Sequence, residues 1–254
     1  IYTNGTWLAD AATSYRLRYR YSGSFGFSYA NNVNSYKGLP DYGKNTNYRI
    51  SWSHSQDAKA NPGSRFSASV NMSSSGYDKN NSYEVADHVT TTRQSSISYS
   101  KYWAGKPITF STSLNQTQNV QNKTMVLNLP KGSFNVSRIY PFKPRKPVAK
   151  SRWYHDLTTQ YSASFENKID TYDSLLFTSA VWKSMKNGFK HEVPFSLQIR
   201  PFNNFSISPS LRYTGVLYTQ RIEKRWDPDY YDEDRNKVVP SVVNDTIRGL
   251  TYGQ

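Results

Sequence analysis

Apolar and polar side chains alternate over unusually long stretches of this chain. Between Tyr15 and Tyr29 every even position carries Arg, Ser or Gly, while the odd positions are mostly aromatic or aliphatic. A period of two is typical of a β-strand. Soluble strands usually end after about 5 or 6 residues, whereas a tilted strand needs about 9 to 11 to cross a bilayer. The pattern therefore predicts a single strand that crosses a bilayer and projects beyond it.

The same alternation recurs along the rest of the chain, which indicates about ten strands in all. The further strands are expected around Tyr48–Trp52, Phe66–Met72, Ile97–Tyr99, Ile108–Leu114, Lys123–Ile139 with a break at Pro130, Leu157–Phe165, Val193–Ile199, Phe205–Tyr213, and from Thr246 onward.

The connections between these strands differ in length and composition. Short ones, rich in Gly, Pro and Asn, suit tight hairpins: Ala58–Ser64, Ala104–Pro107 and Pro201–Asn204, with Phe142–Lys150 as a longer turn. Long polar ones are Asn31–Lys44, Ser73–Thr90 and Ile222–Asp245. Their alternation predicts strands running up and down, as in barrels with short periplasmic turns and long outer loops.

One segment has helical spacing instead. Ser174–Lys186 places Leu176, Phe177, Ala180, Val181 and Met185 on one helical face, with Asp173 as N-cap and Gly188 as the stop. We expect a short amphipathic helix in an outer loop, with its apolar stripe packed on the barrel rim. A membrane-surface role is the alternative.

Composition agrees with a barrel wall. Only 36% of the residues are hydrophobic, and no run of about 20 apolar residues exists, which excludes spanning helices. A barrel strand faces lipid with every second side chain, so half of the wall can be polar. Tyr and Trp near strand ends suit the headgroup boundary, the alternative being aromatics in a soluble sandwich core. The fold class is therefore all-β: an antiparallel up-and-down transmembrane β-barrel, with about ten strands of a larger barrel and one short helix in a loop.

The formal charge of +14 points to an anionic partner, either nucleic acid or phosphorylated lipid. No compact basic patch or domain signature supports nucleic acid, so none is expected. Absence of Cys decides nothing about redox state. The four His residues are dispersed and no catalytic or phosphate-loop motif accompanies them. We predict no enzyme, cofactor or metal, with a membrane-embedded Ser/His hydrolase as the open alternative.

An acidic loop, Asp227–Asp234, has oxygen ligands that a divalent cation would accept. It lacks the glycine and the spacing of an EF-hand, so a solvated loop is favoured over a cation site.

Several strings resemble the Bacteroidota branch of the LptD family of lipopolysaccharide-assembly proteins. They are WSHSQDAKANPGSRFSASV at Trp52–Val70, LNLPKGSFNVSRIYPF at Leu127–Phe142, NGFKHEVPF at Asn187–Phe195, FNNFSISPSLRYTGVLY at Phe202–Tyr218 and DTIRGLTYG at Asp245–Gly253. The resemblance implies a translocon in the Gram-negative outer membrane. It would receive lipopolysaccharide from a periplasmic Lpt bridge, contain an LptE-like lipoprotein plug and contact outer-membrane lipids.

Two parts of the family's architecture have no counterpart among these strings. The family's periplasmic jellyroll, which meets the bridge, and the barrel ends that part as a lateral gate are not recognised here. With no signal peptide before Ile1, we expect residues 1–254 to be part of a single outer-membrane β-barrel domain and favour a fragment over a mature protein.

Basic side chains on the wet side of such a barrel are candidate contacts for lipopolysaccharide phosphates or for the plug, because Arg binds phosphate in a planar, two-pronged manner. The candidates are Arg16, Arg18, Arg20, Arg49, Arg200 and Arg212. The first three are expected on one face of one strand. The alternative to direct contact with lipopolysaccharide, a hydrated lumen wall or contact with the plug protein, is at least as strong. The leading hypothesis for function is delivery of lipopolysaccharide to the outer leaflet. Its alternatives are a general outer-membrane porin or transporter barrel, and a soluble basic β-protein that binds nucleic acid.

Overall fold

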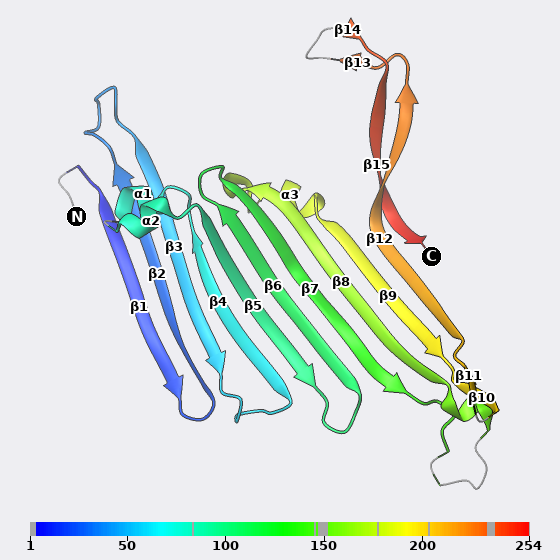
Figure 1. The fold of residues 1–254 in the computed structure, drawn as a ribbon. Coiled ribbons are helices and arrows are strands. Elements are labelled where there is room, and N and C mark those ends of the chain that lie inside the picture. Colours follow the sequence, from blue (N-terminus) through cyan, green and yellow to red (C-terminus); the bar gives the residue numbers. More distant parts are fainter. Residues whose placement is uncertain are drawn as a thin grey trace. The chain divides into compact units, whose positions relative to one another are not determined.

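The computed structural model describes residues 4–82, 84–144, 146, 152–176, 178–202, 204–232 and 237–253 (Figure 1). Eleven strands form one sheet in the order β1-β2-β3-β4-β5-β6-β7-β8-β9-β12-β15. Their bounds are β1 (Trp7–Leu17), β2 (Tyr21–Val33), β3 (Lys44–Gln56), β4 (Ser64–Ser73), β5 (Thr92–Tyr102), β6 (Ile108–Asn119), β7 (Thr124–Ile139), β8 (Thr158–Tyr172), β9 (Lys186–Ser196), β12 (Ser210–Asp227) and β15 (Ser241–Gly253). Strand neighbours follow chain order, so the expected all-β up-and-down sheet is confirmed.

By their internal contacts the residues divide into two compact units. Unit 1 comprises Ile1–Ser137 and Glu166–Met185, and unit 2 comprises Arg138–Phe165 and Lys186–Gln254. Unit 1 holds β1 to β6 and most of β7, whereas unit 2 holds β9, β12 and β15.

The prediction of a single strand from Tyr15 to Tyr29 is wrong. The chain turns at residues 18–20 and forms a hairpin of β1 and β2, in which Leu17 pairs with Tyr21 and Tyr15 with Gly23. The Arg20 amide donates to the Leu17 carbonyl at 3.0 Å, and Tyr19 adopts a φ of 63°. A connection of three residues preserves odd and even parity, because paired residues face the same side. The alternation therefore runs unbroken through a turn, and the sheet has eleven strands rather than ten.

Gly23 is where this hairpin needs glycine. A Cβ there would collide with the backbone oxygen of Ser53 and with the ring of Tyr15. The Tyr15 hydroxyl accepts a hydrogen bond from Trp52 Nε1 at 2.9 Å and bonds to His54 Nδ1 at 2.9 Å. An aromatic ring laid over a glycine of the neighbouring strand fixes the register of a hairpin. Glycine therefore makes room for an aromatic cluster that joins β1, β2 and β3.

Proline does not break β7, contrary to expectation. Ser113 pairs with Lys131 and Asn115 with Asn128, so β7 carries one residue more than β6 between these pairs. This is a β-bulge, and Pro130 lies in the bulged segment of β7, between Asn128 and Lys131. Because proline has no amide hydrogen for the ladder, a bulge is one of the few places where a strand tolerates it.

In unit 2 several strand boundaries differ from the predicted ones. Residues 197–198 and 208–209 interrupt the two expected strands, and a separate ribbon of β10 (Ile199–Phe202) and β11 (Phe205–Ile207) forms the tip. The expected polar loop Ile222–Asp245 is largely strand, since β12 continues to Asp227 and β15 begins at Ser241. Between them lie β13 (Tyr231–Asp232) and β14 (Lys237–Val238).

The helices are short and lie in connections. They are α1 (Tyr77–Asn81), α2 (Val85–Val89), the 3-10 turns η1 (Trp153–Asp156) and η2 (Asp173–Leu175), and α3 (Ser179–Lys183). Sequence reasoning missed α1 and α2. No helix among the described residues is long and apolar enough to cross a membrane.

The predicted helix over Ser174–Lys186 is shorter than expected. It is reduced to η2 and α3, and Gly188 lies inside β9 rather than ending a helix. Asp173 caps no helix; its Oδ2 accepts a hydrogen bond from the Ser75 amide at 3.0 Å. Phe177 and the side chain of Ala180 lie outside the described residues.

The apolar stripe of this segment nevertheless packs on the strands. Leu176 and Val181 form a buried cluster with Met125 and Leu127 of β7 and Ile169 of β8. Leu129 and Met185 are partly buried against the same cluster. This cluster holds the connection after β8 against the sheet.

Candidate functional site

The two faces of unit 1 differ in chemistry. Phe25 pairs with Trp52 and Phe27 with Ile50 on one face, the apolar face, where Phe25 remains 42% exposed. The opposite, polar face carries the serine pairs Ser24–Ser53, Ser67–Ser98 and Ser111–Ser133, whose hydroxyls bond at 2.8, 2.8 and 2.9 Å. An exposed aromatic stripe beside a row of hydroxyls is the pattern of a wall between hydrocarbon and water.

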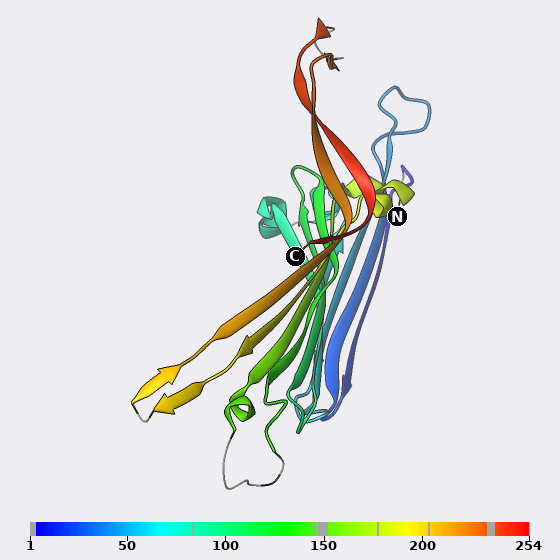
Figure 2. The same ribbon diagram turned by 90° about the vertical axis from the view of Figure 1, so that its right-hand side faces the viewer.

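A folded loop, residues 74–91 with α1 and α2, lies over β2 and β3 near one end of the sheet (Figure 1), and the helices stand out from one side of these strands (Figure 2). Helix α1 contacts β2 and β3, where the paired residues Ala30 and Asn47 are almost fully buried. The Ser74 hydroxyl donates to Asn47 Oδ1 at 3.0 Å. Because Ala30 and Asn47 share parity with Ser28 and Arg49, α1 lies on the polar side of the sheet.

A buried ion pair anchors this folded loop. Asp78 of α1 contacts the guanidinium of Arg93 in β5, and the two residues are only 4% and 3% exposed. Arg93 Nη1 also donates to Asn71 Oδ1 at 2.9 Å. Arg49 Nη1 lies 3.9 Å from Asp78 Oδ1, with its side chain still 31% exposed. Removing one partner of a buried pair is costly, since the remaining charge keeps its desolvation penalty.

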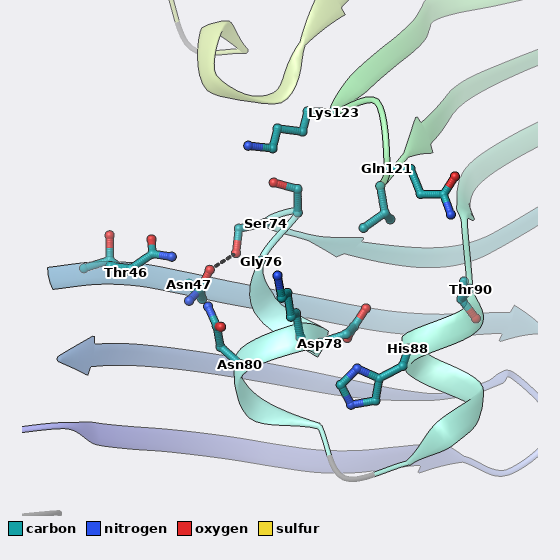
Figure 3. Close-up of a pocket in the computed structure, with 14 residues that line it drawn as sticks. Thr46, Asn47, Ser74, Gly76, Asp78, Asn80, His88, Thr90, Gln121 and Lys123 are labelled. Atoms are coloured by element: carbon teal, nitrogen blue, oxygen red, sulfur yellow. Dashed lines mark hydrogen bonds between the residues drawn. The ribbon is translucent and has the colours of Figure 1, made fainter. Parts of the chain in front are cut away.

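A polar cavity of about 890 Å³ opens beside the folded loop. Figure 3 shows its lining: Asn47 and Thr46 from β3, Asp78, Asn80 and His88 from the loop, and Lys123 from the β6–β7 hairpin. Amide, hydroxyl and ammonium groups dominate, and the His88 Nε2 is bonded to the Ser82 carbonyl at 2.9 Å. Such a lining can hydrogen-bond ordered water or sugar hydroxyls.

The predicted arginines of unit 1 separate into two positions. Arg16 pairs with Ser22, and Arg49 with Ser28 and Ser73, so these two lie on the polar face. Arg18 and Arg20 lie in the hairpin turn and are exposed. The expectation that Arg16, Arg18 and Arg20 share a face of one strand is therefore wrong, because the strand ends at Leu17.

The remaining two candidates belong to unit 2. Arg212 Nε lies 3.2 Å from Glu192 Oε1 in a cross-strand ion pair, in which the arginine is exposed and the glutamate is partly buried. Arg200 belongs to the β10–β11 ribbon, and with Arg152 and Trp153 it lines a pocket of about 470 Å³. Direct contact of any of the six arginines with lipopolysaccharide stays a prediction.

The described residues of the acidic loop contact one another and Arg225. Asp227 ends β12 and pairs with Arg225 at 3.3 Å, and its Oδ1 accepts the Asp229 amide at 3.1 Å. The side chain of Asp232, and residues 233 and 234 entirely, lie outside the described part. Within the described part, no group of three or more His, Cys, Asp or Glu side chains could hold a metal ion.

Asp78 and Arg93 are the structurally important residues that sequence reasoning missed. Asp78 was hidden in a long polar connection. Arg93 carried a signal, because it shares sequence parity with Ile97 and Tyr99 in an alternating segment, where a charged residue is out of pattern. In the structure it lies beyond the last β4–β5 pair, Ser69–Ser96, and its guanidinium contacts Asn71 and Asp78. A charge at an apolar position indicates a buried partner, but the sequence does not say which of the acidic residues supplies it.

An antiparallel up-and-down sheet of long strands, apolar on one face and hydroxyl-rich on the other, defines the wall of an outer-membrane β-barrel. The chain belongs to the LptD protein family, whose family model matches residues 1–254, the whole sequence given. Its role is accordingly lipopolysaccharide transport at the outer membrane of Gram-negative bacteria. A search of curated proteins and a search of solved structures found no match.

Proposed function

We propose that this chain forms part of the wall of a translocon that delivers lipopolysaccharide to the outer leaflet. The observation that carries the proposal is family membership over the whole chain. An LptE-like lipoprotein plug and a periplasmic Lpt bridge, docked through a jellyroll, would be its partners. Residues 1–254 would form part of one barrel domain.

The chemistry of the two faces supports this proposal. Lipopolysaccharide is an amphiphile with a phosphorylated saccharide and several acyl chains. The serine rows, with Arg16 and Arg49, offer the saccharide hydrogen bonds and positive charge. The acyl chains must stay in apolar surroundings, because exposing each methylene to water costs about 0.8 kcal/mol. No covalent step is involved, and energy enters elsewhere in the bridge.

In this role the folded loop would narrow the water-filled space beside the polar face. Its anchoring pair is buried and its lining is polar, so it occupies space on the polar face while remaining hydrated. A loop of this kind would limit leakage of small solutes while leaving a saccharide-compatible surface.

Depletion of the full-length protein in its own cells tests the proposal. Newly made lipopolysaccharide, followed by pulse labelling and surface accessibility, should stall before the cell surface. A general porin or transporter barrel would share the whole strand pattern but leave surface arrival unchanged. Normal surface arrival after depletion would therefore reject the translocon and favour the porin.

Site-specific photocrosslinking tests which face meets the saccharide. A photoreactive residue replacing Ser24 should crosslink to lipopolysaccharide, the plug or water-soluble probes, whereas one replacing Phe25 should crosslink to phospholipid. These neighbours lie one residue apart on opposite faces of β2, so each is the matched control for the other. Crosslinking of the Phe25 site to lipopolysaccharide saccharide and of the Ser24 site to phospholipid would reverse the assignment.

A further inference from the structure

One end of unit 1 carries a concentration of exposed positive charge. The connections at residues 18–20, 57–63 and 103–107 join consecutive strands, so in an up-and-down sheet they lie at the same end (Figure 1). Seven exposed basic side chains lie in these connections or at the adjoining strand ends: Arg16, Arg18, Arg20, Lys59, Arg65, Lys101 and Lys106. We call them the basic rim. Asp57 is the one acidic residue in the same segments.

The opposite end of unit 1 lacks this excess. Its connections, residues 34–43, 74–91, 120–123 and 173–185, together with the adjoining strand ends of the same unit, contain six basic residues, Lys37, Lys44, Lys79, Arg93, Lys123 and Lys183. They contain five acidic ones, Asp41, Asp78, Glu84, Asp87 and Asp173. The asymmetry therefore belongs to one end of the unit and is not a general property of its surface.

Exposed aromatic rings accompany the basic rim. Tyr19 is 60% exposed, with the Arg18 guanidinium carbon 4.8 Å from its ring centroid, and Tyr102 is 53% exposed. Lys101 Nζ lies 5.0 Å from the ring centroid of Trp103. Tyrosine and tryptophan beside basic residues are typical of the boundary between bilayer hydrocarbon and water.

From this arrangement we propose that the basic rim binds anionic phospholipid headgroups of the periplasm-facing leaflet. The apolar face supplies the reason to choose lipid over an acidic protein or a nucleic acid. Tyr21, Phe25 and Phe27 share one face of β2 and leave exposed aromatic surface that begins directly beside Arg20. Cations followed by a continuous apolar stripe match a headgroup followed by acyl chains. A soluble polyanion would leave the stripe uncovered.

This inference rests on the proposed function only for assigning the rim to the periplasm-facing side, where barrels place their short turns. The binding itself depends on charge and on the aromatic rings. Attraction to an anionic surface is worth about fivefold in affinity for each nearby basic residue and falls off within a Debye length.

The test uses the full-length protein in phosphatidylcholine nanodiscs that contain spin-labelled phosphatidylglycerol or spin-labelled phosphatidylcholine. The fraction of motionally restricted label gives the selectivity for the anionic lipid. The wild type should prefer phosphatidylglycerol, and raising salt to about 1 M, where the Debye length is about 3 Å, should weaken that preference. In the rim variant K59Q/R65Q/K101Q/K106Q the selectivity should fall toward one.

A matched control removes the same number of charges from the other end of unit 1. The variant K37Q/K79Q/K123Q/K183Q should keep wild-type selectivity, with folding of both variants checked by circular dichroism. If the rim variant does not fold, the pairs R18Q/R20Q and K101Q/K106Q should each give a partial loss. A wild type without selectivity, or an equal loss in the control, would overturn the inference. Lipid selectivity combined with normal surface arrival of lipopolysaccharide after depletion would instead reject the proposed function alone.

Discussion

Substitution D78A should release the folded loop from the polar face. Asp78 is the partner of the buried Arg93 guanidinium. Removing one member of a buried pair costs about 3–5 kcal/mol, because the other charge is left desolvated and unpaired. At about 1.4 kcal/mol per factor of ten, this shifts the equilibrium between attached and released loop by about 10² to 4 × 10³.

Hydrogen–deuterium exchange of the folded full-length protein measures this release. The amides of Asn80 and Ser82 are good reporters, because they donate to the Gly76 and Asp78 carbonyls at 3.2 and 3.0 Å. Both should exchange about 10²-fold faster or more in D78A. The neighbouring substitution K79A, at an exposed residue, is the control and should leave exchange unchanged.

A double substitution separates the charge effect from a general loss of packing. Replacing both members by apolar residues, D78L/R93M, removes the unpaired charge, and exchange should return toward the wild-type rate. Unchanged exchange in D78A, or a double variant that exchanges faster than D78A, would refute the claim that this ion pair holds the loop.

Three further substitutions test the packing and electrostatics of the sheet. L176A should destabilise the connection after β8 by about 2–5 kcal/mol, as truncation does at other buried leucines. The amides of this connection should exchange faster, while the amides of β2 and β3 stay protected. G23A should lower the yield of folded protein, because its Cβ would meet backbone, whereas G188A, where the nearest atom is 3.6 Å away, should fold normally on gel-shift and circular dichroism assays. R212Q should change the unfolding free energy by no more than about 1 kcal/mol, since Arg212 is mostly exposed and water screens its pair with Glu192. A larger loss in denaturant titration would contradict this.

The candidate site was only partly foreseeable. Arg16 and Arg49 were correctly placed by parity on the polar face, because parity is a local property of a strand. Arg18 and Arg20 were misplaced, because a turn of three residues leaves parity unchanged and so left no trace in the alternation. The Asp78–Arg93 pair joins residues 15 positions apart across an intervening helix, and pairing of that kind depends on the path of a loop.

What the sequence determined by itself was the strand content and the two-faced chemistry of the strands. These follow from period-two patterning and turn composition, which act over a few residues. The predicted alternation of short and long connections held only in part, because the β6–β7 connection spans only residues 120–123 and the β7–β8 connection runs from residue 140 to residue 157. Only the tertiary structure decided that the connection after β4 folds back over the polar face, that the segment after β8 packs as two short turns on Met125 and Ile169, and that Pro130 lies in a bulge. Each of these depends on contacts between residues far apart in the chain, whose energies no local pattern encodes.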